Sequence, residues 1–247
     1  MSRRSPFADV PRHDLAVPDP DGDPESHVEV TADEPGSGAG VVASGARVVV
    51  VQLPGTALDR PVGPPGADPT AWTRALVEDT CELAAGLAGV VVVLAGGPAA
   101  LRAHADLVWP GTPTVALTGT RTPLDQLLAA VAGAIAVVVL PADVPDLPGL
   151  LVGKLFRDLG TADLALCPSA GGGLAAFGIR LPPADWVVAA DPGPGSDPAV
   201  LDAAAPTPTS CRTVPGWHRR PGDLSRLNPG LEGWDSTRAL LSGRPLG

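Results

Sequence analysis

The feature that most constrains the fold is an unbroken apolar run near the middle of the chain. Residues 134–140 read Ala-Ile-Ala-Val-Val-Val-Leu, with no polar alternation. Such a run is typical of a strand buried on both faces, as in a parallel sheet that helices cover. Further strands are predicted at residues 47–53, 90–94, 113–117, 162–167, 174–181 and 210–214.

Helical patterns lie between these strands. Asp68-Pro69 and Thr122-Pro123 each combine a capping residue with a proline suited to the first helical turn. Helices are predicted over residues 69–88, 98–104, 123–132, 148–159, 196–205 and 234–241. The alternation through residue 167 predicts an α/β protein whose mostly parallel sheet has right-handed crossovers and becomes mixed near its end.

Charge and composition divide the chain into two parts. Residues 1–45 hold nine acidic and three basic side chains, with many prolines and glycines and few large apolar residues. Such a segment buries too little surface to offset its chain entropy. We therefore predict a disordered acidic tail over 1–45 and a single domain over 46–247.

Composition also excludes several classes of protein. No apolar stretch follows Arg3 and Arg4, and the longest apolar runs are too short to span a bilayer. This predicts a cytoplasmic protein with no membrane partner. A net charge of −10 and a single lysine argue against a nucleic-acid partner. The oligomeric state is left open.

The three cysteines, Cys81, Cys167 and Cys211, are widely spaced and odd in number. This pattern supports neither a disulfide framework nor a zinc site. We therefore predict that all three are buried thiols.

A candidate site follows the central strand. Asp143 and Asp146 come directly after it, among three prolines that stiffen the turn. Ligands of parallel sheets bind beyond the carboxyl ends of the strands, and carboxylates there suit hard cations. For Asp143 a ligand role is favoured over a solvated turn. For Asp146 a cap on the following helix is favoured over a role in the site.

The chain resembles an uncharacterised bacterial family of glycosyltransferase-like proteins related to phospholactate guanylyltransferase. Four stretches carry the resemblance: residues 76–84, 141–148, 167–173 and 177–180. The resemblance covers roughly residues 46–183. It implies a glycosyltransferase-A-like (Rossmann-like) fold and a nucleotide-activated small-molecule donor. It also implies a divalent cation, Mg²⁺ or Mn²⁺, held on Asp143 against the phosphates of the donor.

Further site residues follow from the resemblance and from the hypothesis that the protein is an enzyme. In an enzyme, Arg60 and Arg121 would face phosphate, and Asp146 would support Asp143 or cap the following helix. The glycine run would let the backbone approach the donor or the acceptor; it consists of Gly171, Gly172 and Gly173.

Two classes of function remain open from the sequence. The first is a metal-dependent glycosyltransferase or nucleotidyltransferase. The second is a degenerate, non-catalytic relative that serves as a binding or interaction module. Arg60 is the only basic residue of the loop after the first strand, and Gly171 stands where relatives carry an acid.

Overall fold

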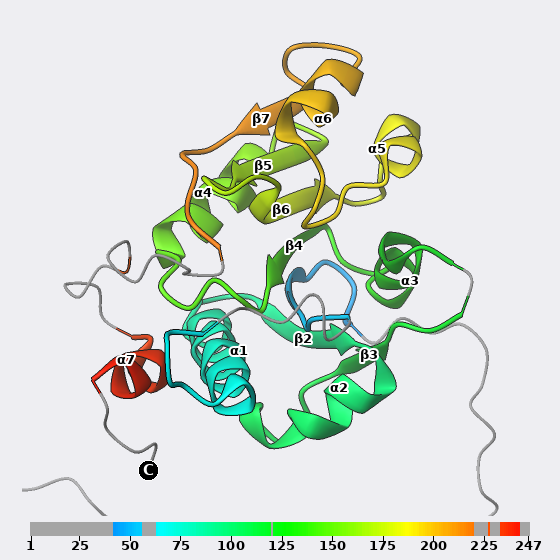
Figure 1. Ribbon diagram of the computed structural model, residues 1–247. Helices are drawn as coiled ribbons and strands as arrows, with labels where there is room; N and C mark the ends of the chain where they lie inside the picture. Colours follow the sequence, from blue (N-terminus) through cyan, green and yellow to red (C-terminus); the bar gives the residue numbers. More distant parts are fainter. Residues whose placement is uncertain (1–41, 56–62, 120, 220–226, 228–232, 243–247) are drawn as a thin grey trace, which may run out of the picture. The chain divides into compact units, whose positions relative to one another are not determined.

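The structure is a computed structural model, and it describes residues 42–55, 63–119, 121–219, 227 and 233–242 (Figure 1). The chain divides into two units, Met1–Ser37 and Gly38–Gly247, and all described residues belong to the second. The acidic tail predicted over 1–45 lies almost entirely outside the described residues. Both domain boundaries therefore remain predictions.

The described residues form one seven-stranded sheet with the order β3-β2-β1-β4-β6-β5-β7. Every strand runs parallel to its neighbours except β6, which is antiparallel to both β4 and β5. The predicted mostly parallel sheet, mixed near its end, is confirmed. The strands are β1 (Arg47–Gln52), β2 (Val91–Gly96), β3 (Thr114–Ala116), β4 (Ala136–Pro141), β5 (Leu164–Pro168), β6 (Leu174–Arg180) and β7 (Cys211–Thr213).

The reversed direction of β6 has a local cause. Only residues 169–173 connect β5 to β6, and so short a connection can join only antiparallel strands. The strand returns between β4 and β5, where Val138 pairs with Gly178 and Gly178 pairs with Ala165.

The helices begin largely where the capping sequences predict. Asp68 accepts a hydrogen bond from Ala71 N at 2.7 Å, and Thr122 accepts one from Asp125 N at 3.2 Å. The helices are α1 (Pro69–Ala85), α2 (Pro98–Ala103), the 3₁₀ helix η2 (Ala105–Leu107), α3 (Pro123–Ala130), α4 (Gly149–Asp158), α5 (Asp185–Ala190), α6 (Pro198–Ala204) and α7 (Asp235–Leu241). The sequence did not predict α5, a six-residue helix whose cap residue Ala184 offers no side-chain hydrogen bond.

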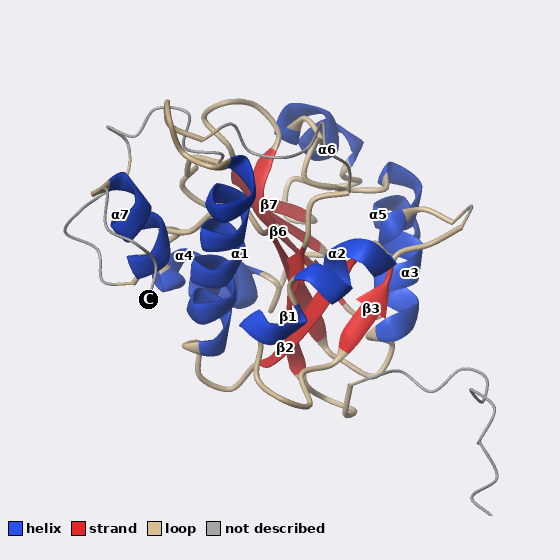
Figure 2. Ribbon diagram, turned by 60° about the horizontal axis from the view of Figure 1, so that its bottom comes forward, coloured by secondary structure: helices blue, strands red, loops and turns tan. Residues whose placement is uncertain are grey.

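Helices cover both faces of the sheet (Figure 2). Val49 and Val51 of β1 belong to a buried cluster that includes apolar side chains of α1 and α4. Val48 and Val50 belong to the opposite cluster, with side chains of α3, α5 and α6. Burying a valine completely stabilises a fold by roughly 1.5–3 kcal/mol, so successive residues of one strand stabilise both layers.

The predicted buried thiols are confirmed. Cys81, Cys167 and Cys211 are buried and form no disulfide. Burial raises the pKa of Cys81 and Cys167 to about 12 and that of Cys211 to about 11. No helix among the described residues is long and apolar enough to cross a membrane.

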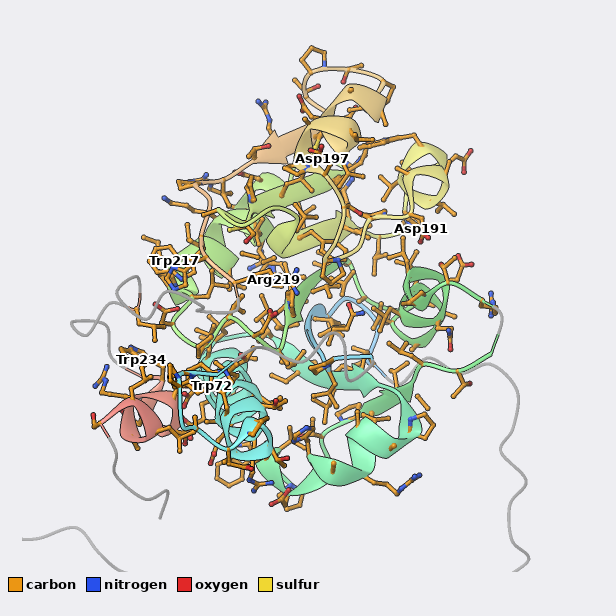
Figure 3. All side chains as sticks on the ribbon, viewed as in Figure 1. Trp72, Asp191, Asp197, Trp217, Arg219 and Trp234 are labelled. Atoms are coloured by element: carbon orange, nitrogen blue, oxygen red, sulfur yellow. The ribbon has the colours of Figure 1, made fainter. Side chains whose placement is uncertain are left out.

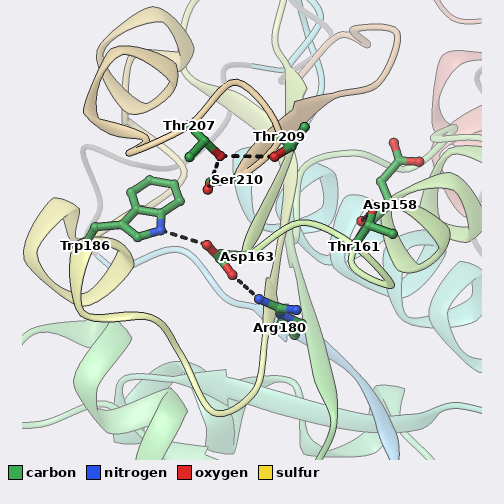
Figure 4. Close-up of polar contacts among 8 residues, drawn as sticks. All are labelled: Asp158, Thr161, Asp163, Arg180, Trp186, Thr207, Thr209 and Ser210. Atoms are coloured by element: carbon green, nitrogen blue, oxygen red, sulfur yellow. Dashed lines mark hydrogen bonds and ion pairs between the residues drawn. The ribbon is translucent and has the colours of Figure 1, made fainter.

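A polar cluster fixes the amino end of β5 (Figure 4). The indole of Trp186 donates to Asp163 Oδ2 at 3.0 Å, and Arg180 forms an ion pair with the same carboxylate. The Trp186 hydrogen bond, followed by the Arg180 pair, lowers the pKa of Asp163. The cluster therefore links α5, β5 and β6 at the end of the sheet opposite the candidate site.

Candidate functional site

A pocket of about 360 Å³ lies at the carboxyl ends of β1 and β4. Gln52 pairs with Pro141 there, and Ala142 N donates to Gln52 O at 2.9 Å. The strand order reverses between these strands, because β2 lies on one side of β1 and β4 on the other. Open α/β sheets bind their ligands at such a position. The lining residues are Gln52, Leu53, Pro54, Gly55, Pro123, Pro141, Ala142, Asp143, Pro194, Gly195 and Arg219.

The loop that carries the two predicted aspartates is buried. Asp143 is 4% exposed and Asp146 is 3% exposed. The solvated turn that the sequence left open for Asp143 is therefore wrong. A carboxylate removed from water needs charged or hydrogen-bonding partners, because its desolvation otherwise costs several kcal/mol.

Arg219 supplies these contacts for Asp143. Its Nε donates to Asp143 Oδ1 at 2.9 Å, and its Nη2 donates to Oδ2 at 3.1 Å. Its Nη1 also donates to the backbone oxygen of Pro194 at 2.7 Å. Figure 3 places Arg219 at the end of the segment that runs from β7 toward the carboxyl end of β4. The planar guanidinium therefore joins three segments that are distant in the sequence.

Asp146 has different partners from the same segment. Trp217 Nε1 donates to Asp146 Oδ1 at 3.2 Å, and His218 Nε2 lies 2.8 Å from Oδ1 and 2.9 Å from Oδ2. The Trp217 and His218 rings stack with centroids 5.0 Å apart. The favoured prediction of a helix cap at Asp146 is wrong, because α4 begins after Pro148, which makes no side-chain cap bond.

Backbone contacts hold the 214–219 segment against β5. Val214 N donates to Leu166 O at 2.8 Å, and Trp217 N donates to Pro168 O at 2.9 Å. A Cβ at Gly216 would lie 2.8 Å from Pro168 O, so only glycine permits this approach without a shift. Tertiary contacts therefore place Trp217, His218 and Arg219 over the β4–α4 loop.

The glycine run forms the turn between β5 and β6. Gly172 and Gly173 have positive φ angles of 91° and 74°, and a Cβ on Gly173 would lie 2.4 Å from Pro194 O. Pro194 lines the pocket, whereas Gly171, Gly172 and Gly173 do not. The run thus supports the pocket wall from behind. A direct contact between these glycines and a donor or acceptor stays a prediction.

The structure describes one of the two predicted arginines. Arg60 lies outside the described residues. Arg121 is exposed, two residues before the pocket residue Pro123, and its carbonyl accepts from Gln126 Nε2 at 3.1 Å. Their roles toward phosphate stay predictions.

Among the described residues, the basic side chain that lines the pocket is Arg219, which sequence reasoning missed. One signal was available: Trp217, His218, Arg219 and Arg220 are consecutive in a part of the chain with weak secondary-structure pattern.

The carboxylates expected to hold or support the predicted cation are hydrogen-bonded to other side chains. Both oxygens of Asp143 accept from Arg219, and those of Asp146 face His218 and Trp217. Among the described residues, no three His, Cys, Asp or Glu side chains form a group that could hold a metal ion. Mg²⁺ or Mn²⁺ on Asp143 would have to share the carboxylate oxygens with Arg219.

Comparisons with known proteins establish the fold. No protein-family model and no curated protein matches the sequence. The structure is similar to that of a protein described as a candidate nucleotide-diphospho-sugar transferase from Desulfovibrio desulfuricans G20. The TM-score is 0.56 at 18% identity, and the match covers 83% of this chain and 100% of that chain.

A second similar structure is the 4-diphosphocytidyl-2C-methyl-D-erythritol synthase of Anaerococcus prevotii DSM 20548. Its TM-score is 0.51 at 11% identity, and the match covers 80% of this chain and 96% of that chain. The chain therefore has the nucleotide-diphospho-sugar transferase-like fold that the sequence predicts. The narrower resemblance to relatives of phospholactate guanylyltransferase stays a prediction.

Proposed function

We propose that this protein is a transferase that binds a nucleotide-activated small-molecule donor in the pocket at the carboxyl ends of β1 and β4. The observation that carries the proposal is the position of this pocket, at the point where the strand order reverses. Its volume of about 360 Å³ lies within the usual range for small-molecule sites. The similar structures support the class of reaction, transfer of a nucleotidyl or glycosyl group.

The pocket residues suit different parts of such a donor. The side chain of Gln52 offers hydrogen bonds to a base or sugar, and the backbone at Gly55 and Gly195 leaves room for close approach. Arg219 is positioned to meet phosphate oxygens. The cation implied by the resemblance would share the carboxylate of Asp143 with Arg219, and no step of this proposal depends on a metal.

A thermal-shift screen tests the proposal. The full chain is heated with millimolar UDP, GDP, CDP, ADP and the matching triphosphates, with EDTA or with Mn²⁺. A ligand at 100 times its Kd stabilises the folded state by about 2.7 kcal/mol, which corresponds to roughly 5–10 °C in Tm for a domain of this size. We expect at least one nucleotide to raise the Tm of the wild type.

A pocket-blocking variant supplies the control. A Cβ on Gly195 would meet no atom within 4 Å, so Gly195→Phe can place a ring beside the pocket without a clash at its Cβ. Gly97→Phe adds the same ring at another open position that does not line the pocket. We expect Gly195→Phe alone to abolish the nucleotide shift. No shift for the wild type, or equal shifts for both variants, would contradict the proposal.

A further inference from the structure

The Arg219 guanidinium lies where the resemblance places a divalent cation, on the carboxylate of Asp143. We propose that Arg219, anchored by Asp143, binds the donor phosphates in place of that cation, so that phosphate binding needs no divalent metal. This inference rests on the proposed function and assigns the residue that recognises the phosphates.

The hydrogen bonds of Arg219 leave donors for a ligand. A guanidinium carries five N–H groups, one on Nε and two on each terminal nitrogen. With the described residues, Arg219 uses its Nε–H, one Nη2–H toward Asp143 and one Nη1–H toward Pro194. In its contacts with the described residues, one N–H therefore remains on each terminal nitrogen of a side chain that lines the pocket. Each can donate a charge-assisted hydrogen bond to a phosphate oxygen.

Burial fixes the direction of these donors. The side chains of Asp143 and Arg219 are 5% and 13% exposed, and the backbone at Trp217 is pinned to Pro168. Charge-assisted hydrogen bonds are stronger in such a site than in water, because the surroundings screen them less. The guanidinium is therefore held in position before any ligand arrives, which reduces the ordering cost of binding.

The net charge of the Arg219–Asp143 pair limits how strongly Arg219 attracts phosphate. A divalent cation on one carboxylate leaves a net positive charge, whereas the Arg219–Asp143 pair is formally neutral. Recognition by Arg219 therefore depends on directed N–H donors more than on net charge. We expect moderate affinity for phosphate that depends on the shape of the guanidinium, so that lysine replaces arginine only in part.

Calorimetric titration of the full chain with inorganic pyrophosphate tests the inference without knowledge of the base. We expect the wild type to bind pyrophosphate in EDTA, with a Kd that Mn²⁺ changes by less than about threefold. Arg219→Gln is expected to weaken binding by about 10- to 100-fold in EDTA, and Arg219→Lys by less. Arg157→Gln, on an exposed arginine that does not line the pocket, should bind as the wild type does.

A second variant separates loss of binding from loss of the fold. Arg219→Gln removes the Arg219 guanidinium from the buried carboxylate of Asp143, which destabilises the protein. The double variant Asp143→Asn, Arg219→Gln replaces the ion pair by two neutral amides, and it should fold and still fail to bind pyrophosphate.

Two results would overturn the inference. Binding of pyrophosphate or a nucleotide that requires Mn²⁺ and disappears in EDTA would refute it while leaving the proposed function intact. Wild-type affinity of the double variant in EDTA would refute it as well. If neither pyrophosphate nor any nucleotide binds under either condition, the proposed function is also wrong.

Discussion

At the scale of single residues, the site depends on a position, Gly173, where only glycine fits without a shift. Gly173 combines a φ of 74° with a hypothetical Cβ 2.4 Å from Pro194 O. Pro194 O also accepts the Arg219 bond and the backbone N–H of Leu174, at 2.7 and 2.9 Å. A side chain at Gly173 would therefore displace the carbonyl that helps to orient the guanidinium.

We predict that Gly173→Ala destabilises the protein and weakens phosphate binding. The left-handed backbone alone costs about 1–2 kcal/mol for a residue with a Cβ, and the collision with Pro194 adds to this cost. Gly171→Ala is the matched control for stability, because its Cβ meets no atom within 4 Å and its φ is not positive. We expect it to change stability by less than about 0.5 kcal/mol. Urea unfolding measures both, and equal effects would disprove the explanation.

At the scale of elements, α7 is joined to α1 by a buried carboxylate. Asp79 of α1 is 1% exposed and accepts from the backbone N–H groups of Ser236 and Thr237, at 3.1 and 2.7 Å. Burial raises the pKa of Asp79 to about 6, although these hydrogen bonds oppose the rise. Asp79 thus caps a helix about 160 positions away in the sequence, and its protonation affects the stability of the fold.

The pKa of Asp79 in the folded and in the unfolded protein decides how the free energy of unfolding changes with pH. Between pH 3.8 and about 6, Asp79 is mostly protonated in the folded state and mostly ionised in the unfolded state. The free energy of unfolding therefore falls as the pH rises through this range. The contribution is at most about 3 kcal/mol, at 1.36 kcal/mol for each pH unit. We predict that the free energy of unfolding of the wild type, relative to Asp79→Asn, decreases from pH 4 to pH 6 and is level above pH 7.

A matched variant isolates the effect of burial. Asp235, also at the start of α7, has a side chain that is 81% exposed. Asp235→Asn removes an exposed carboxylate from the same end of α7, so its urea unfolding over the same pH range is the control for the loss of a buried one. A difference between the wild type and Asp79→Asn that does not change between pH 4 and pH 6 would contradict the assignment.

At the scale of the whole molecule, the sheet separates the candidate site from a structural polar cluster. The pocket lies at the carboxyl ends of β1 and β4, and the Asp163 cluster lies at the amino end of β5 (Figure 4). Apolar layers on both faces of the sheet support these ends. Because all these features belong to the unit Gly38–Gly247, its stability should not need residues 1–37.

We therefore predict that deletion of residues 1–37 changes neither the Tm nor its nucleotide-induced rise by more than about 1 °C. The reason is that a tail with few large apolar residues contributes little buried surface. Differential scanning calorimetry of the full and shortened chains measures both quantities. A fall of several degrees would show that the acidic segment contributes to the fold, contrary to the sequence prediction.

Most of the fold was predictable because its signals are local. Apolar runs placed the strands, and Asp68 and Thr122 with their following prolines placed the starts of two helices. The mixed end of the sheet was predicted, and the short connection of residues 169–173 is its structural cause. Helix α5 was missed in a part of the chain with weak secondary-structure pattern, and the cap role of Asp146 was wrong because α4 begins after Pro148.

The sequence by itself determined the α/β architecture and the position of Asp143 beyond a central strand, since periodicity and strand ends are properties of neighbouring residues. Only the tertiary structure decided what surrounds Asp143. The contact with Arg219 spans 76 positions, and it depends on how β7 pairs with β5 and on the backbone contacts of residues 214–217. Such a pairing leaves no local pattern, because the partner of a buried charge is selected by the packing of the whole sheet.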